Sequence, residues 1–149
     1  MLQLATEKDW EDVKRLSIQI HDLHVSWRQD MYYHSDEPLP HDVFSELIDE
    51  KMVYVAKLSE VIVGYIVVAI VHKGGQGMHP KKMLRIESIC VDETLRGHGI
   101  GLQIIQDTKA LCTAFGCDGL ILGVHPENDR AVNFYQKCGF RIRTINMEM

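Results

Sequence analysis

The chain has 149 residues, 46% of them hydrophobic and 25% charged, with a formal net charge of −5. These are the proportions of a globular protein, and they predict one domain, residues 1–149, that buries a core without disulfides or metal. The longest apolar run, residues 61–71, is too short to span a membrane, and we expect a cytoplasmic protein with reduced cysteines and no membrane or nucleic-acid partner.

The first third of the chain predicts a short strand and two helices. Residues 1–5 form the strand, and Thr6 caps a first helix whose apolar side chains recur every three or four residues as far as Trp27. A proline-containing loop separates this helix from a second, shorter one over residues 41–49. The histidines of this region lack the helical carboxylate-histidine spacing of a metal site, so we predict that no metal binds.

Three strands are predicted in the middle of the chain. Residues 52–58 and 61–71 have alternating and then continuous apolar patterns, which indicate an antiparallel hairpin whose second strand is buried on both faces. Residues 72–80 contain three glycines and a proline, and they predict a flexible loop. This loop leads into the central strand, residues 83–91.

A glycine-rich turn and a helix follow the central strand directly. The turn holds Gly97, Gly99 and Gly101, and the amphipathic helix extends over residues 99–115. The first amides of a helix have no partner within it, and the helix dipole adds positive charge there, so this segment predicts a pyrophosphate site. The glycines match neither the lysine-bearing loop of P-loop proteins nor the dinucleotide fingerprint.

The last third of the chain predicts a parallel strand, a helix and a final strand. Residues 119–124 form the parallel strand, Asn128 caps a helix that ends at Lys137, and residues 141–147 form the final strand. The sequence shows no repeats and no domain linker. The predicted order is therefore strand, two helices, three strands, helix, strand, helix and strand.

Two sequence motifs carry a resemblance to a known family. Arg96-Gly97-His98-Gly99-Ile100-Gly101 fits R-x-x-G-x-G after the pair Val91-Asp92, and residues 128–140 fit N-x-x-A-x-x-x-Y-x-x-x-G-F. In this order the motifs resemble those of the GNAT superfamily of acyl-coenzyme A N-acyltransferases. The resemblance implies an α/β fold (an α+β mixed sheet), mostly antiparallel and flanked by about four helices. It also implies that acetyl-coenzyme A is the co-substrate and that the chain can pair as a homodimer.

The chemistry of amide formation assigns roles to two side chains. An amine of pKa about 10 must lose a proton, and the leaving thiolate must gain one or be stabilised. Alternation places Glu87 on the face of Ile89 and Val91, where it is the predicted general base. Its alternative role is an ion pair with Arg85 or a buried acid with a hydrogen-bonded partner. In the resembling family the tyrosine that matches Tyr135 is the general acid, and its alternative role is a core side chain.

Cofactor binding is predicted along the strand, the turn and the last helix. In the resembling family a bulge leaves main-chain amides of the central strand free for the pantetheine chain and the thioester, a feature that sequence alone does not show. For Cys90 a core position is the favoured alternative. The predicted cofactor-binding residues are Ile89, Cys90, Val91, Arg96, Gly97, His98, Gly99, Ile100, Gly101, Asn128 and Tyr135.

The identity of the acceptor amine is not readable from the sequence. Residues 22–50 carry eight acids against one base, in the helices that border the acceptor site of the resembling family. This charge either attracts a cationic small molecule or basic peptide or covers solvated helix faces, and both alternatives stay open. The leading hypothesis is an acetyl-coenzyme A dependent N-acetyltransferase, and the alternative is a non-catalytic module that binds or senses acyl-coenzyme A.

Overall fold

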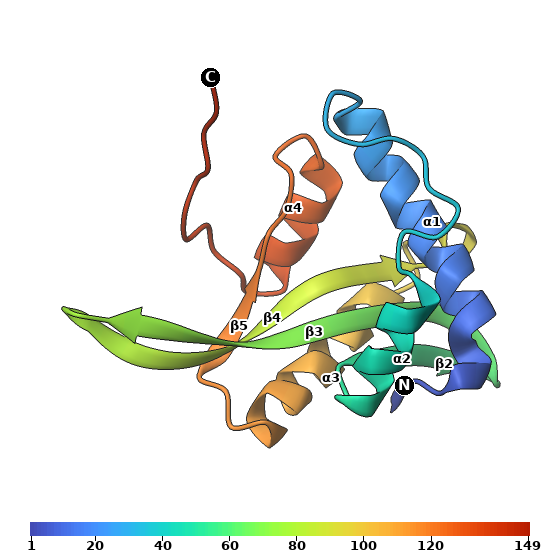
Figure 1. Cartoon of the computed structure of the whole chain (residues 1–149), viewed down its shortest axis with the longest axis horizontal. Coiled ribbons are helices and arrows are strands. Elements are labelled where there is room, and N and C mark those ends of the chain that lie inside the picture. The colour runs from blue at the N-terminus through green and yellow to red at the C-terminus, as the bar shows by residue number, and fades with distance from the viewer.

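The computed structural model describes all 149 residues and contains one five-stranded sheet in the order β1-β2-β3-β4-β5. The first four strands pair antiparallel, and β5 pairs parallel to β4. The strands are β1 (Leu2–Leu4), β2 (Val53–Leu58), β3 (Val61–Gly75), β4 (Met78–Val91) and β5 (Gly119–Leu122). This mixed sheet with helices on both faces (Figure 1) confirms the predicted fold class.

Four helices cover the two faces of the sheet. They are α1 (Trp10–Trp27), α2 (His41–Asp49), α3 (Ile100–Ala114) and α4 (Asp129–Lys137). Apolar side chains of α1 and α2 pack against one face of the sheet, and those of α3 and α4 pack against the other. Val13 and Leu16 of α1 are fully buried, as their predicted spacing on one helix face requires. No helix is both long enough and apolar enough to cross a bilayer.

The strand β3 lies in the middle of the sheet and is buried on both faces. Every residue from Ile62 to Val68 is buried, which confirms the prediction from the continuous apolar run. Gly64 lies against the main chain of β4. A Cβ added at Gly64 would lie 2.7 Å from the carbonyl oxygen of Cys90 and 3.1 Å from Cδ1 of Ile104, so this position has no room for a side chain.

The substitution Gly64→Ala should therefore destabilise the protein by about 1–3 kcal/mol, because the backbone of β4 must shift to admit the methyl group. Urea unfolding followed by circular dichroism measures the change. Gly123→Ala is the matched control, since a Cβ at Gly123 meets nothing within 4 Å. Equal losses of stability in the two variants would contradict the steric explanation.

The predicted loop over residues 72–80 is wrong, because β3 and β4 continue to pair through most of it. β3 extends to Gly75, β4 begins at Met78, and these two residues form the last pair of the ladder. Figure 1 shows the two strands as an arm that projects beyond the rest of the sheet. The glycines suggested a loop, but pairing between β3 and β4 satisfies the backbone polar groups of this segment. Gly74 and Gly77 have positive φ angles of 142° and 80°, which allow the chain to turn between the two strands.

The predicted final strand over residues 141–147 is also wrong, since residues 141–149 form no strand. The edge strand β5 has only four residues, and the C-terminal segment runs away from the sheet without pairing to it (Figure 1). Its ion pair joins Oε1 of Glu148 to Nη1 of Arg28, just past the end of α1, at 2.7 Å. A β pattern without a partner strand leaves its amides and carbonyls unpaired, so the pattern alone does not produce a strand.

Candidate active site

The strands β4 and β5 stop pairing partway along β4. Their parallel pairing runs from Met83 and Gly119 to Ile86 and Leu122 and stops there. β4 continues to Val91, whereas β5 ends at Leu122. One edge of residues 87–91 is therefore left without a partner strand, and we call the resulting space the β4–β5 gap.

A bulge in β4 lies at the start of this gap. Val67 of β3 pairs with Ser88, and the next residue, Val68, pairs with Ile86, so Glu87 is an extra residue in the ladder. The structure thus contains a bulge of the kind that the resemblance implied. Sequence alone does not reveal it, because it depends on the register between two strands.

The bulge also corrects the predicted orientation of Glu87. Leu84 and Ile86 are buried on the side of α3, so Arg85 between them points to the side of α1. Oε1 of Glu87 accepts a hydrogen bond from Nε of Arg85, which places Glu87 on that same side. Ile89 and Val91 pack on the side of α3, so the predicted common face with Glu87 is wrong. Alternation fails here because the bulge adds one residue.

The main chain of the strand beyond the bulge faces the gap at every second residue. The amide of Asp92 donates to the carbonyl of Val63 on β3 at 2.9 Å. Because polar groups alternate along a strand, Val91 and Ile89 turn their amides toward the gap. Nε of Arg96 donates to the carbonyl oxygen of Val91 at 3.0 Å, which fits this orientation. Two strand amides are thus available to a ligand in the gap.

Cys90 takes the alternative position that the sequence favoured. Its side chain is 3% exposed and packs in the core beneath α1, and its residue pairs with Tyr65 of β3. Burial raises the pKa of the Cys90 thiol to about 11, so the thiol stays protonated and unreactive at neutral pH. Neither the side chain nor the main chain of Cys90 is directed at the gap.

The N-terminus of α3 is open, as an anion site requires. Gly97 and Gly99 have φ angles of 86° and 82°, a left-handed conformation that suits glycine, and a Cβ on either would meet nothing within 4 Å. No side chain caps the helix, so its first amides keep their hydrogen-bonding capacity for a ligand. A Cβ at Gly101 would lie 3.2 Å from Cζ of Phe134, so this glycine allows α4 to approach α3 closely.

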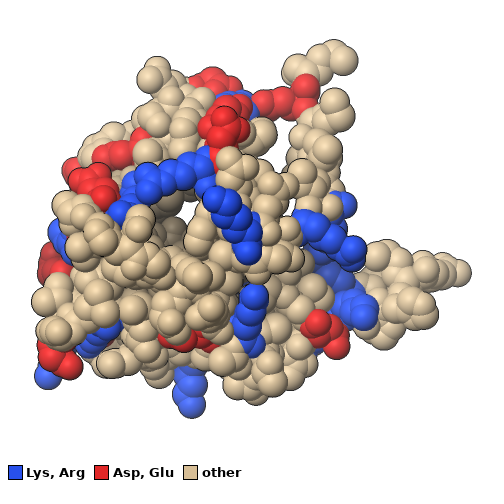
Figure 2. Space-filling view, turned by 180° about the vertical axis from the view of Figure 1, so that it is seen from behind, with Lys and Arg blue, Asp and Glu red and all other residues tan.

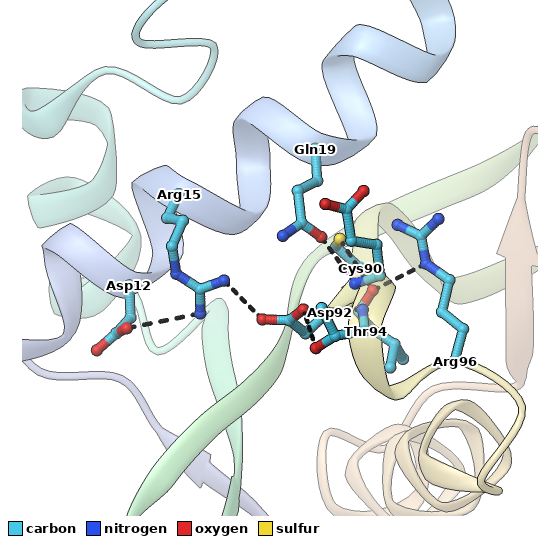
Figure 3. A network of polar contacts seen from close by, with 9 residues as sticks. Asp12, Arg15, Gln19, Cys90, Asp92, Thr94 and Arg96 are labelled. Atoms are coloured by element: carbon cyan, nitrogen blue, oxygen red, sulfur yellow. Dashed lines mark hydrogen bonds and ion pairs between the residues drawn. The ribbon is translucent and has the colours of Figure 1, made fainter.

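A polar network fastens α1 to the turn before α3 (Figure 3). Nη1 of Arg15 lies 2.6 Å from Oδ2 of Asp92, and Oδ1 of Asp92 accepts hydrogen bonds from the amide and hydroxyl of Thr94 at 3.1 and 2.9 Å. Gln19 accepts from the amide of Glu93 at 2.9 Å. No sequence pattern points to Arg15 or Gln19, because each lies more than 70 residues from its partner.

The hydrogen bond from Arg15 holds the pKa of Asp92 at about 2, below its ordinary value of 3.8. A lowered carboxyl pKa stabilises the fold above pH about 4, and this contribution of about 1–2 kcal/mol should disappear as the pH falls from about 4 to 2. Urea unfolding across this pH range should show a smaller acid loss for Asp92→Asn than for the parent chain. Asp12→Asn, which removes an exposed partner of Arg15 at 3.7 Å, is the control and should keep the parent profile.

The predicted residues Asn128 and Tyr135 belong to α4, which approaches the start of α3 where Phe134 lies against Gly101. Oδ1 of Asn128 accepts from the amide of Ala131 at 3.1 Å, which confirms Asn128 as the helix cap. The ring of Tyr135 packs between Phe134 and Phe140, with ring centroids 5.3 and 5.7 Å away, and its hydroxyl makes no hydrogen bond within the chain. Burial raises the pKa of Tyr135 to about 12, so the phenol remains a proton donor at neutral pH.

The gap and the open helix end together suit a long anionic ligand that carries amide groups. Donors in the gap match carbonyl groups, and the start of α3 matches a pyrophosphate. Figure 2, which views the molecule from behind, shows a hollow bordered by Lys and Arg side chains. Of the predicted turn residues, His98 instead directs Nδ1 to the carbonyl of Leu95 at 3.1 Å.

Comparison with protein families agrees with this geometry. The family model described as the acetyltransferase (GNAT) family matches residues 18–140, which is most of the chain. The chain belongs to this family. It is similar to a glucosamine 6-phosphate N-acetyltransferase of Dictyostelium discoideum, with 36% identity over 64 residues, 43% of this chain and 39% of that protein.

Other relatives extend the comparison to whole structures. The uncharacterized N-acetyltransferase YvbK of Bacillus subtilis is 33% identical over 63 residues, 42% of this chain and 41% of that protein. The matches thus span about two fifths of these curated relatives. A mutant of the BH1408 protein of Bacillus halodurans has a TM-score of 0.94 at 33% identity, covering 100% of this chain and 98% of that one. The aminoglycoside N-acetyltransferase AAC(6')-Iy, solved with CoA, shares the fold with a TM-score of 0.72 at 19% identity, covering 100% and 98%.

Proposed function

We propose that the protein transfers the acetyl group of acetyl-coenzyme A to the nitrogen of a primary amine. The observation that supports this most directly is the arrangement of two sets of unpaired amides, in the β4–β5 gap and at the start of α3. The pyrophosphate of coenzyme A suits the helix end, and its pantetheine amides and thioester suit the gap. The N-acetyltransferases among its relatives, and a neighbouring structure that contains CoA, support the same ligand.

The residues around the gap have complementary roles in this proposal. The thioester supplies an acyl carbon that an amine can attack. The amides of Ile89 and Val91 would stabilise negative charge on the carbonyl oxygen during attack. Tyr135 would give its phenolic proton to the sulfur, and its raised pKa keeps that proton in place at neutral pH. The role of Glu87 as general base stays a prediction. The bulge directs its carboxylate to the face of the sheet that α1 covers.

The acceptor in this proposal is a cationic small molecule or a basic peptide. The eight acids of residues 22–50 support a cationic acceptor through their long-range field. The relatives named above include enzymes whose names specify an amino sugar phosphate and an aminoglycoside, both of which carry amines. The panel of acceptors to test therefore contains amino sugars, which these names suggest, and polyamines and basic peptides, which the acidic residues suggest.

The proposal also includes a cytoplasmic location and a homodimer. Ile142, Ile145 and Met147 of the C-terminal segment are 67%, 76% and 92% exposed, and contact with a second copy would cover such apolar side chains. Gel filtration coupled to light scattering at several protein concentrations measures the oligomeric state directly.

Two measurements on the purified chain test the proposed activity. Calorimetry with acetyl-coenzyme A and with coenzyme A should show binding of both ligands. Release of free thiol from acetyl-coenzyme A should then depend on the presence of at least one amine from the panel. Absence of binding would exclude the proposed cofactor site. Binding without thiol release for every amine would instead favour a non-catalytic module that binds or senses acyl-coenzyme A.

A further inference from the structure

Four aromatic side chains from three segments meet beside the gap. His24 and Trp27 belong to α1, Tyr32 follows that helix, and His125 lies in the connection between β5 and α4. The ring centroid of His24 lies 5.8 Å from Trp27, 5.7 Å from Tyr32 and 5.5 Å from His125. His125 also lies 5.9 Å from Tyr32. We call these four residues the histidine cluster.

The histidine cluster lies where the end of α1 meets the β5–α4 connection, on the side of the sheet that α1 covers. His125 comes three residues after Leu122, the last residue of β5 that pairs with β4. α1 packs against the face to which Arg85 and Glu87 point. Figure 1 shows the end of α1 and the β5–α4 connection next to each other above β4. The cluster is therefore on the side from which α1 and Glu87 face the gap, and we take this as the side from which an amine approaches a thioester.

His24 is the histidine of this cluster whose ring nitrogens are both without a hydrogen-bond partner. Its ring makes no hydrogen bond and no ion pair, whereas Nε2 of His125 lies 3.4 Å from the hydroxyl of Tyr32. The groups that face His24 are His21 from its own helix, Tyr32 from the following loop and His125 from the β5–α4 connection. No carboxylate contacts its ring, and the guanidinium of Arg28 one turn away is paired with Asp30 and Glu148.

These surroundings keep His24 uncharged. Burial, together with His125 and His21, lowers the pKa of His24 from its ordinary value of 6.5. A proton on His24 would lose hydration through burial and would be repelled by a proton on His125 or His21. His24 is therefore neutral at pH 7 and above. A neutral imidazole with a free lone pair is a proton acceptor at the pH at which a primary amine is still protonated. Glu87, in contrast, has its carboxylate occupied by Arg85.

We propose that His24 takes the proton that the ammonium group of the acceptor must lose, and that His125 and Tyr32 hold His24 in position. This inference rests on the proposed function. One proton moves from the ammonium nitrogen to the imidazole of His24, and the freed lone pair forms the bond to the acyl carbon. The carbon–sulfur bond breaks with its electron pair on sulfur, which takes a proton from Tyr135. The second proton of the nitrogen restores the phenol, and His24 releases its proton to water.

The pH dependence of kcat/KM for thiol release separates this route from its alternative. In the parent chain kcat/KM should increase with pH up to about 6.5. Above that pH it should level off, because His24 is then fully neutral. In His24→Asn the level region should disappear, with kcat/KM about 100-fold lower at pH 7.5 and rising with pH toward the amine pKa of about 10. Glu87→Gln, measured in the same way, tests the carboxylate as the competing base. NMR titration of the His24 ring should give a pKa below 6.5 in the parent chain.

His34→Asn is the matched control for a surface histidine near the same helix end. His34 is paired with Asp22 and Asp36 at 2.9 and 2.8 Å, outside the cluster, and its replacement should leave the profile unchanged. Coenzyme A binding by calorimetry should be equal in all variants, which shows that each is folded. A level region that persists in His24→Asn overturns this inference alone, and its loss in Glu87→Gln would then assign the proton transfer to Glu87. Failure of the parent chain to acetylate any amine overturns the proposed function and this inference with it.

Discussion

Tyr135→Phe is expected to lower kcat about 100-fold and to leave the affinity for coenzyme A nearly unchanged. The hydroxyl of Tyr135 makes no hydrogen bond within the chain, so its removal leaves no partner unsatisfied. Phenylalanine keeps the ring between Phe134 and Phe140. The loss should therefore appear in the chemical step, where the departing sulfur no longer receives a proton. Steady-state thiol release and calorimetry with coenzyme A measure the two quantities separately.

Tyr54→Phe provides the matched control for this substitution. Tyr54 belongs to the same core cluster, is 8% exposed, and its hydroxyl also lacks an internal hydrogen bond. Removing that hydroxyl should change neither kcat nor affinity. Because the pKa of Tyr135 is about 12, the parent activity should show no alkaline decline from this group below about pH 11. A kcat in Tyr135→Phe equal to that of Tyr54→Phe would remove the general-acid role.

The parts of the site that sequence predicted are those built from short segments. The glycine turn and the start of α3 are contiguous, and their conformation follows from glycine chemistry and helix geometry. The cap at Asn128 and the position of Tyr135 on α4 follow in the same way from helical spacing. These features were predicted because every interaction that defines them lies within one or two helical turns.

The parts that sequence missed depend on contacts between distant segments. The bulge at Glu87 arises from the register of β4 against β3, and it reverses the side to which that carboxylate points. The network of Arg15 with Asp92 and the cluster of His24 with His125 join residues that are 77 and 101 positions apart. No pattern within a segment encodes such pairs. The sequence alone relates the histidines of α1 only to a metal site, because His125 belongs to no motif.

The strand errors have the same physical origin. Residues 72–80 have the composition of a loop but extend a ladder that the preceding strand has already begun. Residues 141–147 have the composition of a strand but find no partner at the short edge strand β5. Strand formation is decided by the availability of a neighbouring backbone, so composition predicts it less well than it predicts a helix.

Gly99→Val should weaken binding of coenzyme A and acetyl-coenzyme A about 100-fold or more. Valine is strained at a φ of 82°, and its branched side chain would stand beside the uncapped amides at the start of α3. The pyrophosphate would then lose hydrogen bonds to several amides, each contributing about 1.5–3 kcal/mol to a charged partner. Calorimetry measures the affinity, and thermal unfolding measures the separate cost of strain.

Gly116→Val separates loss of the anion site from general destabilisation. Gly116 has a φ of 66°, follows the other end of α3, and also has open space around its Cβ position. Both variants should therefore unfold at similarly reduced temperatures, while only Gly99→Val should lose affinity. Parent-like affinity in Gly99→Val would show that the pyrophosphate does not bind at the start of α3. Equal loss of affinity in both variants would show that reduced stability causes the weaker binding. Both glycines have a positive φ angle, but only Gly99 lies at the start of α3.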